Sequence, residues 1–167
     1  MGALVLTLMG WMARTVMGMP VNLEMMLGTM LGATAAYYGS WFDMAVMRAT
    51  DILLAFPGIL LALTVMAAWG RGLEKMALVV GVVSIPAFAR QARASALVLR
   101  ENDYVSAARA LGAGDFRIIF RQILPNATGP LTVLATLRFG EAILTVAGLS
   151  FLGLGVPPEV AEWGLML

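Results

Sequence analysis

The chain has 167 residues, of which 60% are hydrophobic and 13% are charged. Soluble domains average about 45–50% apolar and about 25% charged residues, so this composition predicts a membrane protein and argues against an ordinary soluble domain. The chain contains no cysteine and no histidine, which excludes disulfides, thiolate or imidazole metal ligands and Ser-His catalysis. The net charge of +1 gives no reason to expect a nucleic-acid partner. We therefore expect no catalytic residues, no metal site and no cofactor.

Four apolar stretches approach the length of about 20 residues that a helix needs to cross a bilayer. They predict an all-α, polytopic transmembrane bundle whose spans cover about residues 15–39, 52–70, 76–94 and 127–149. Within the second span, Pro57 is expected to kink the helix, and Asp51 is expected to cap its first turn. The sequence does not predict the topology of residues 1–24, because the apolar run Met1–Ala13 is too short to span a bilayer and is followed by Arg14, Pro20, Asn22 and Glu24.

Basic residues are concentrated in the connection between the third and fourth predicted spans. The positive-inside rule places such a connection in the cytoplasm, so residues 95–126 form the expected cytoplasmic loop and residues 150–167 the expected external segment. By the same counting the chain begins outside the cell, which predicts that a preceding helix is missing. Of the 11 Lys and Arg residues, six lie between the end of the third apolar run at Ala89 and the start of the fourth at Ala127: Arg90, Arg93, Arg100, Arg109, Arg117 and Arg121.

The loop begins with a short helix of mostly small residues, predicted over residues 104–111. Asn102 or Asp103 is expected to cap this helix, and Gly112 and Gly114 are expected to end it. An amphipathic loop lying on anionic lipid would explain the arginines, but it would not explain the small residues between glycines. A short helix of this kind, projecting from a membrane domain, is shaped to enter a groove on another protein.

A second loop helix is predicted over residues 115–124, capped by Asp115 and ended by Pro125. Its apolar residues have the spacing i, i+3, i+4, i+7, which predicts one buried face, with basic residues on the opposite face. The residues of the apolar face are Phe116, Ile119, Phe120 and Ile123, and those of the basic face are Arg117 and Arg121.

Ala107, Ala108 and Gly112, followed by Leu124 and Pro125, have the spacing of a known loop motif. They resemble the EAA loop of binding-protein-dependent ABC importer permeases, which reads Glu-Ala-Ala, three residues, Gly, nine residues, Ile, any residue, Leu-Pro. This chain departs from the motif twice, because Ser106 replaces the Glu and Gln122 replaces the Ile.

Further segments resemble the dipeptide, oligopeptide and nickel branch of this permease family, so that the resemblance covers about residues 27–167. These segments are Asp51–Gly58, Gly148–Pro158 and Trp163-Gly164. Permeases of the family usually have six spans, and this chain supplies about four. Residues 1–167 are therefore expected to form a single, incomplete permease domain.

The resemblance implies that the loop docks on a separate cytoplasmic ATPase and couples ATP-driven closure to movement of the membrane helices. This chain has no P-loop motif, and Lys75 is its only lysine, so ATP hydrolysis is expected in a partner chain and the protein itself is not expected to be an enzyme. The expected ATPase-docking residues are Asp103, Tyr104, Val105, Ser106, Ala107, Ala108, Arg109, Ala110, Leu111, Gly112, Leu124 and Pro125.

The resemblance also implies a function: a permease subunit that forms the translocation path of an importer in a bacterial or archaeal inner membrane. Its implied partners are cytoplasmic ABC ATPase subunits, a second permease subunit in a heterodimer, an extracytoplasmic solute-binding protein and the lipid bilayer. The branch favours dipeptides or oligopeptides as substrates, with nickel or another small solute as the alternative. From a different class, a non-transporting membrane scaffold or a degenerate permease fragment is the alternative. An intramembrane serine protease is excluded, because Ser150 lacks the glycine two residues later and the chain has no histidine.

Three features within the spans carry further expectations. Gly28 and Gly32 form a Gly-x-x-x-Gly pattern, which favours internal helix packing over dimerisation. Arg138 and Glu141 lie at spacing i, i+3 inside the fourth span, where they form either a local ion pair or part of the transport pathway. Residues 148–155 are expected to form a tight loop at the external end of that span.

Overall fold

The computed structural model describes residues 21–70 and 73–153, and within these ranges it is built of helices with no strand. This confirms the predicted all-α fold. The helices are α2 (Val21–Tyr38), α3 (Ser40–Ala55), α4 (Gly58–Trp69), α5 (Leu73–Leu99), α6 (Asp103–Ala110), α7 (Asp115–Ile118), the π-helix η1 (Ile119–Ile123), α8 (Leu124–Asn126) and α9 (Thr128–Phe151).

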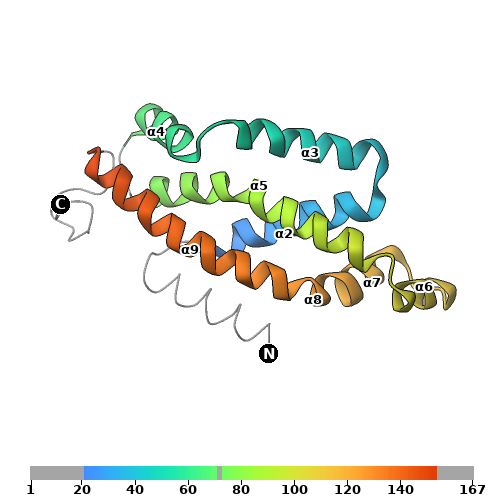
Figure 1. Cartoon of the computed structure of the whole chain (residues 1–167). Coiled ribbons are helices and arrows are strands. Elements are labelled where there is room, and N and C mark those ends of the chain that lie inside the picture. The colour runs from blue at the N-terminus through green and yellow to red at the C-terminus, as the bar shows by residue number, and fades with distance from the viewer. Residues whose placement is uncertain (1–20, 71–72, 154–167) are drawn as a thin grey trace.

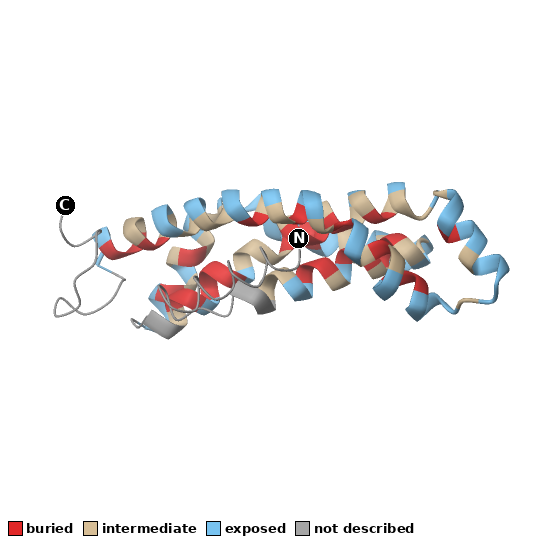
Figure 2. Cartoon of the chain, turned by 90° about the horizontal axis from the view of Figure 1, so that it is seen from below, coloured by how far each residue is buried: buried red, intermediate tan, exposed pale blue. Residues whose placement is uncertain are grey.

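The long helix α5 is the centre of the bundle, and α2, α3, α4 and α9 all pack against it (Figure 1). The α2–α3 connection and the loop that carries α6 and α7 lie at one end of the bundle. The α4 helix and the end of α9 lie at the opposite end. Figure 2 shows buried residues on the inward faces of the helices and exposed residues around the outside.

The closest helix contact, between α2 and α5, depends on residues without large side chains. Gly28 and Gly32 of α2 lie directly against the backbone of α5: a Cβ atom at Gly28 would be 2.7 Å from the carbonyl oxygen of Ile85, and one at Gly32 would overlap the carbonyl group of Ala89. Small residues at such a crossing allow two membrane helices to approach closely. The structure confirms that the Gly-x-x-x-Gly pattern serves internal packing.

The second predicted span, 52–70, is not one kinked helix. Two helices, α3 and α4, meet at an angle of 83° at the break between Ala55 and Gly58. Phe56 is extended (φ −91°, ψ 134°), as expected for a residue before proline, and so it ends α3 completely. The expectation that Asp51 caps this helix is also wrong, because Asp51 lies inside α3.

By length and apolar composition, two described helical segments, Lys75–Leu99 and Thr128–Phe151, could each cross a bilayer, and the bent pair of α3 and α4 could form a third crossing. The predicted four-span count stays a prediction, because residues 15–20 lie outside the described part of the chain. Most of the segment 150–167, which is predicted to be external, also lies outside the described residues, so its location stays a prediction.

Two loop boundaries differ from the prediction. The loop that is predicted to be cytoplasmic begins near residue 100 rather than residue 95, because α5 continues to Leu99. The tight loop expected at residues 148–155 is helical at its start, because α9 continues to Phe151. Its backbone turns at Gly153, where φ is +75°.

Two ion pairs join α3 to α5 and were not expected from the sequence. Arg93 binds Asp43 through two hydrogen bonds of 2.6 Å, from Nε to Oδ1 and from Nη2 to Oδ2. Arg90 binds Asp51 at 2.7 Å. The signal was present, because both arginines lie one turn apart on α5 and both aspartates lie two turns apart on α3.

Candidate functional site

The α6 helix is closed at its C-terminal end by a complete Schellman motif. Gly112 has φ +81°, its N–H donates to the carbonyl of Arg109, and the N–H of Ala113 donates to the carbonyl of Ala108, both at 3.0 Å. At the other end Asn102 is the N-cap residue, although its side chain makes no capping hydrogen bond. The glycine stop predicted at Gly112 is therefore confirmed.

Opposite faces of α6 differ sharply in exposure. Val105 is completely buried. The residues on the opposite side of the helix, among them Ser106, Ala107 and Ala110, are exposed, and Leu111 directly after the helix is 88% exposed. We call this exposed face the α6 surface; its residues are Asp103, Ser106, Ala107, Ala110 and Leu111.

Val105 anchors α6 in a hydrophobic cluster that joins the loop to the bundle. The cluster brings together residues of α2, α5, α6, α7 and η1, and Tyr37, Ala113 and Leu124 pack around it. The loop is therefore attached to the ends of both α2 and α5 and is not a free projection. The buried members are Ala33, Ala36, Ala96, Val105, Ile118 and Ile123.

Polar contacts from the end of α2 reinforce this attachment. The hydroxyl of Tyr37 donates a hydrogen bond of 2.6 Å to Oδ1 of Asp115, and Nη2 of Arg109 donates to the same hydroxyl oxygen at 3.3 Å. The hydrogen bond to Tyr37 raises the pKa of the Arg109 guanidinium above its usual value. Arg100 donates a hydrogen bond of 2.6 Å to the carbonyl of Ala36. Sequence reasoning missed Tyr37, because its partners lie more than 70 residues away along the chain.

The predicted cap and end of the second loop helix are both wrong. Gly114 is the N-cap residue of α7, and the Asp115 carboxylate accepts the Tyr37 hydrogen bond instead of capping. Pro125 lies within the first two residues of α8, where its missing N–H is tolerated, so only Ala127 separates α8 from α9.

The predicted apolar face of this helix is also partly wrong. Ile119 and Ile123 are buried as expected, but Phe116 and Phe120 are exposed and stack on each other with ring centroids 4.2 Å apart. The reason is the π-helical turn η1, whose i→i+5 hydrogen bonding changes the side-chain register. Ile118 and Ile123, five residues apart, consequently share the buried face.

Of the expected docking residues, the structure brings Tyr104 close to the Leu-Pro end of the motif. Nδ2 of Asn126, directly after Pro125, lies 3.4 Å from the hydroxyl oxygen of Tyr104. Pro125 is exposed, whereas Leu124 packs against the cluster and Val105 lies inside it. Val105 and Leu124 are therefore placed to hold the loop in position, whereas the residues of the α6 surface are exposed.

Replacing Tyr37 by phenylalanine is expected to loosen the loop without unfolding the bundle. The change removes a hydrogen bond to a carboxylate at a partly exposed site, which costs about 1 kcal/mol and corresponds to about fivefold faster local opening. Amide hydrogen exchange over residues 105–118 measures this opening. The matched control is Tyr38→Phe, on the exposed neighbouring ring. Equal exchange rates in the two variants would contradict the assigned role of Tyr37.

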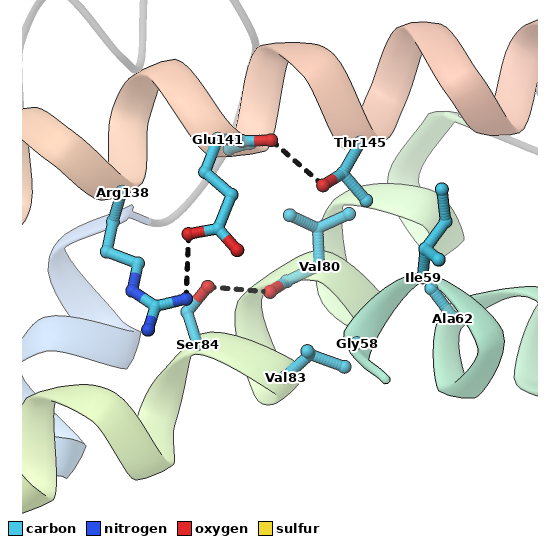
Figure 3. Close-up of a pocket in the computed structure, with 10 residues that line it drawn as sticks. Gly58, Ile59, Ala62, Val80, Val83, Ser84, Arg138, Glu141 and Thr145 are labelled. Atoms are coloured by element: carbon cyan, nitrogen blue, oxygen red, sulfur yellow. Dashed lines mark hydrogen bonds and ion pairs between the residues drawn. The ribbon is translucent and has the colours of Figure 1, made fainter. Parts of the chain in front are cut away.

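A cavity of about 280 Å³ lies between α4, α5 and α9 (Figure 3). Arg138 and Glu141 form an ion pair of 2.8 Å within it, which is the local pair that was one of the two alternatives expected from their spacing; the pathway role stays a prediction. Their side chains extend from α9 towards α5. The lining residues are Gly58, Ile59, Ala62, Val80, Val83, Ser84, Arg138, Glu141, Ala142 and Thr145.

Comparison with known proteins identifies the family of this chain. Residues 28–167 match the family described as "Binding-protein-dependent transport system inner membrane component". The chain belongs to this family. Its members are integral membrane permeases, and they work with ATPase and binding-protein partners in ABC importers. The resemblance noted in the loop motif is thereby confirmed.

Individual relatives share close to half of the aligned residues with this chain. It is 48% identical over 147 residues to the glutathione transport system permease protein GsiD of Pectobacterium atrosepticum, which covers 88% of the chain and 49% of that protein. It is 47% identical over 143 residues to the dipeptide transport system permease protein DppC of Alkalihalophilus pseudofirmus, covering 86% and 47% respectively. The chain thus spans about half the length of the curated relatives it matches.

Proposed function

We propose that this chain is a permease subunit of an ATP-driven importer and that the α6 surface receives the movement of a separate cytoplasmic ATPase. The observation that carries the proposal is the contrast between the two faces of α6. Val105 holds the helix in the cluster, while exposed alanines and Leu111 are presented outward. Small side chains permit close approach to a partner groove, and an exposed leucine at its edge supplies apolar contact area.

The anchor contacts suggest the route by which movement would pass into the membrane part. Displacing α6 would displace Val105, and with it the buried cluster that includes Ala36 at the end of α2 and Ala96 near the end of α5. The hydrogen bond between Tyr37 and Asp115 connects the same two parts. Because packed elements move together rather than deforming continuously, α2 and α5 would shift as one unit with the loop.

We propose small peptides as the transported substrates, with support from the printed names of the dipeptide and glutathione permeases. The other partners that we propose for this chain are a second permease subunit and an extracytoplasmic solute-binding protein. The loop containing α6 would face the cytoplasm, in agreement with its arginines.

Site-specific cross-linking tests the coupling proposal. Because the chain has no cysteine, Ala110→Cys introduces a single thiol on the α6 surface, and Ala94→Cys places a control thiol at an exposed position of α5. In membranes of the source cells, a short bifunctional maleimide is expected to join Ala110→Cys, but not Ala94→Cys, to a protein whose peptides contain a P-loop ATPase motif. Cross-linking of both variants, or of neither, to such an ATPase would refute the proposal.

A further inference from the structure

The charged pair in the cavity lies near the middle of a membrane-length helix. Arg138 and Glu141 are residues 11 and 14 of the 24 in α9. At about 1.5 Å per residue they lie roughly 16–21 Å along this helix, close to the centre of a hydrocarbon layer about 30 Å thick. Charged groups at that depth are costly and characteristically serve a substrate or ion pathway.

The pair is accessible from the cavity. The Glu141 side chain is 61% exposed, although Arg138 already binds one of its oxygens. The break between α3 and α4 contributes to the opening, because the first residues of α4, Gly58 and Ile59, form part of the wall. Gly58 allows α4 to lie against α5: a Cβ atom there would be 3.1 Å from Cγ1 of Val83.

The polar groups around the pair are matched to an ammonium group and a carboxylate. Ser84 donates its hydroxyl hydrogen to the carbonyl of Val80 at 3.0 Å, and Thr145 donates to the carbonyl of Glu141 at 2.8 Å (Figure 3). Each hydroxyl oxygen therefore keeps lone pairs for a ligand. The Glu141 carboxylate lines the same cavity, so the cavity offers three acceptor groups, as many as the N–H groups of an ammonium ion. The guanidinium of Arg138 has the forked donors that bind a carboxylate through two hydrogen bonds.

We propose that the cavity between α4, α5 and α9 binds the termini of a zwitterionic peptide, with Arg138 binding the carboxylate and Glu141, Ser84 and Thr145 binding the ammonium group. This inference rests on the proposed transport of small peptides and names the part of the chain that would recognise them. Apolar wall residues, including Ile59, Val80 and Ala142, would contact the peptide side chains.

The energetic reason for preferring a zwitterion is that it replaces one ion pair by two. A ligand with a single charge would leave either Arg138 or Glu141 unpaired at the depth of the hydrocarbon layer, which is unfavourable. A ligand with both charges opens the internal pair and satisfies each partner. When no peptide is bound, Arg138 and Glu141 therefore neutralise each other, and each exchanges this partner for a terminus of the peptide on binding.

Protection of a single cysteine from alkylation tests the site. Ala142→Cys places a thiol in the cavity wall, and Ala94→Cys is the control on α5 outside it. The full chain, in native membranes without ATP, is treated with N-ethylmaleimide and increasing dialanine, N-acetyl-dialanine or dialanine amide. Dialanine is expected to slow labelling of Ala142→Cys, whereas the two blocked peptides and all labelling of Ala94→Cys are expected to show little effect.

Changing the charged residues in the Ala142→Cys background makes the test specific. Glu141→Gln and Arg138→Gln are each expected to raise the half-protecting dialanine concentration at least about tenfold, because each removes one charge-assisted hydrogen-bonding partner. Glu141→Asp keeps the charge and is expected to retain protection. Equal protection by all three peptides, unchanged protection in both Gln variants, or an Ala142→Cys thiol that is never labelled would each overturn the proposal.

This result is separable from the coupling test. Protection needs no ATPase, so discrimination among the peptides without cross-linking at Ala110→Cys would support the site and refute the coupling. Cross-linking without discrimination would support the coupling and refute the site.

Discussion

Replacing Ala107 by tryptophan is expected to reduce ATP-dependent uptake at least about fivefold while leaving the amount of protein in the membrane unchanged. Ala107 lies on the exposed α6 surface, so the larger ring has room in the isolated chain. In the proposed complex the same ring would fill the groove of the ATPase, and overpacking of a close contact costs about 1–3 kcal/mol, which is up to about a hundredfold in binding. The measurements are uptake of labelled dialanine by the source cells and co-purification of the ATPase.

The matched control is Ala94→Trp, which adds the same ring at an exposed position of α5 outside the loop. It is expected to retain uptake and co-purification. If Ala107→Trp transported and co-purified as well as this control, the α6 surface would not be where the ATPase binds, whatever the family membership of the chain.

Replacing Gly32 by valine is expected to prevent stable packing of the bundle. Even the Cβ atom of alanine at this position would overlap the Ala89 carbonyl group, which is backbone and cannot rotate away. We expect Gly32→Ala to cost about 1–3 kcal/mol, as for other overpacked cores, and Gly32→Val to cost more. Thermal unfolding of the purified chain in nanodiscs should show a transition several degrees lower for Gly32→Ala and loss of the folded species for Gly32→Val.

Gly129→Ala is the control for this prediction, because a Cβ atom at Gly129 meets nothing within 4 Å. Its unfolding temperature is expected to stay the same or to rise slightly, since alanine is a better helix former than glycine by about 1 kcal/mol. A Gly32→Ala variant as stable as Gly129→Ala would mean that α2 and α5 are not in close contact.

Predictions from local sequence were confirmed where a single residue type determines the backbone conformation or the helix spacing. The stop after α6 was predictable because Gly112 tolerates positive φ, and the structure closes the helix there. Close packing at Gly28 and Gly32 was predictable for a related reason, since only small residues permit such contact. The pairing of Arg138 with Glu141 followed from their spacing on one helix.

Predictions were wrong where the local structure depends on packing between distant parts of the chain. Pro57 was expected to kink one span, but Phe56 became extended and α3 and α4 separated into two helices at 83°. The register of the second loop helix changed at η1, because burial of Ile118 and Ile123 in the cluster required a π-helical turn. A helical wheel assumes 3.6 residues per turn throughout, so it cannot predict the change of register at a π-helical turn.

The sequence by itself determined that this chain is a helical membrane protein of the importer permease family and that its basic, motif-bearing segment lies within residues 90–126. Composition, arginine clustering and short motifs are local properties, and they suffice for those conclusions. Only the tertiary structure decided which face of α6 is free, that Tyr37 and Val105 attach the loop to α2 and α5, and that Arg138 and Glu141 line a cavity with Ser84 and Thr145. These features join residues tens of positions apart, and their contacts exist only once the helices have packed.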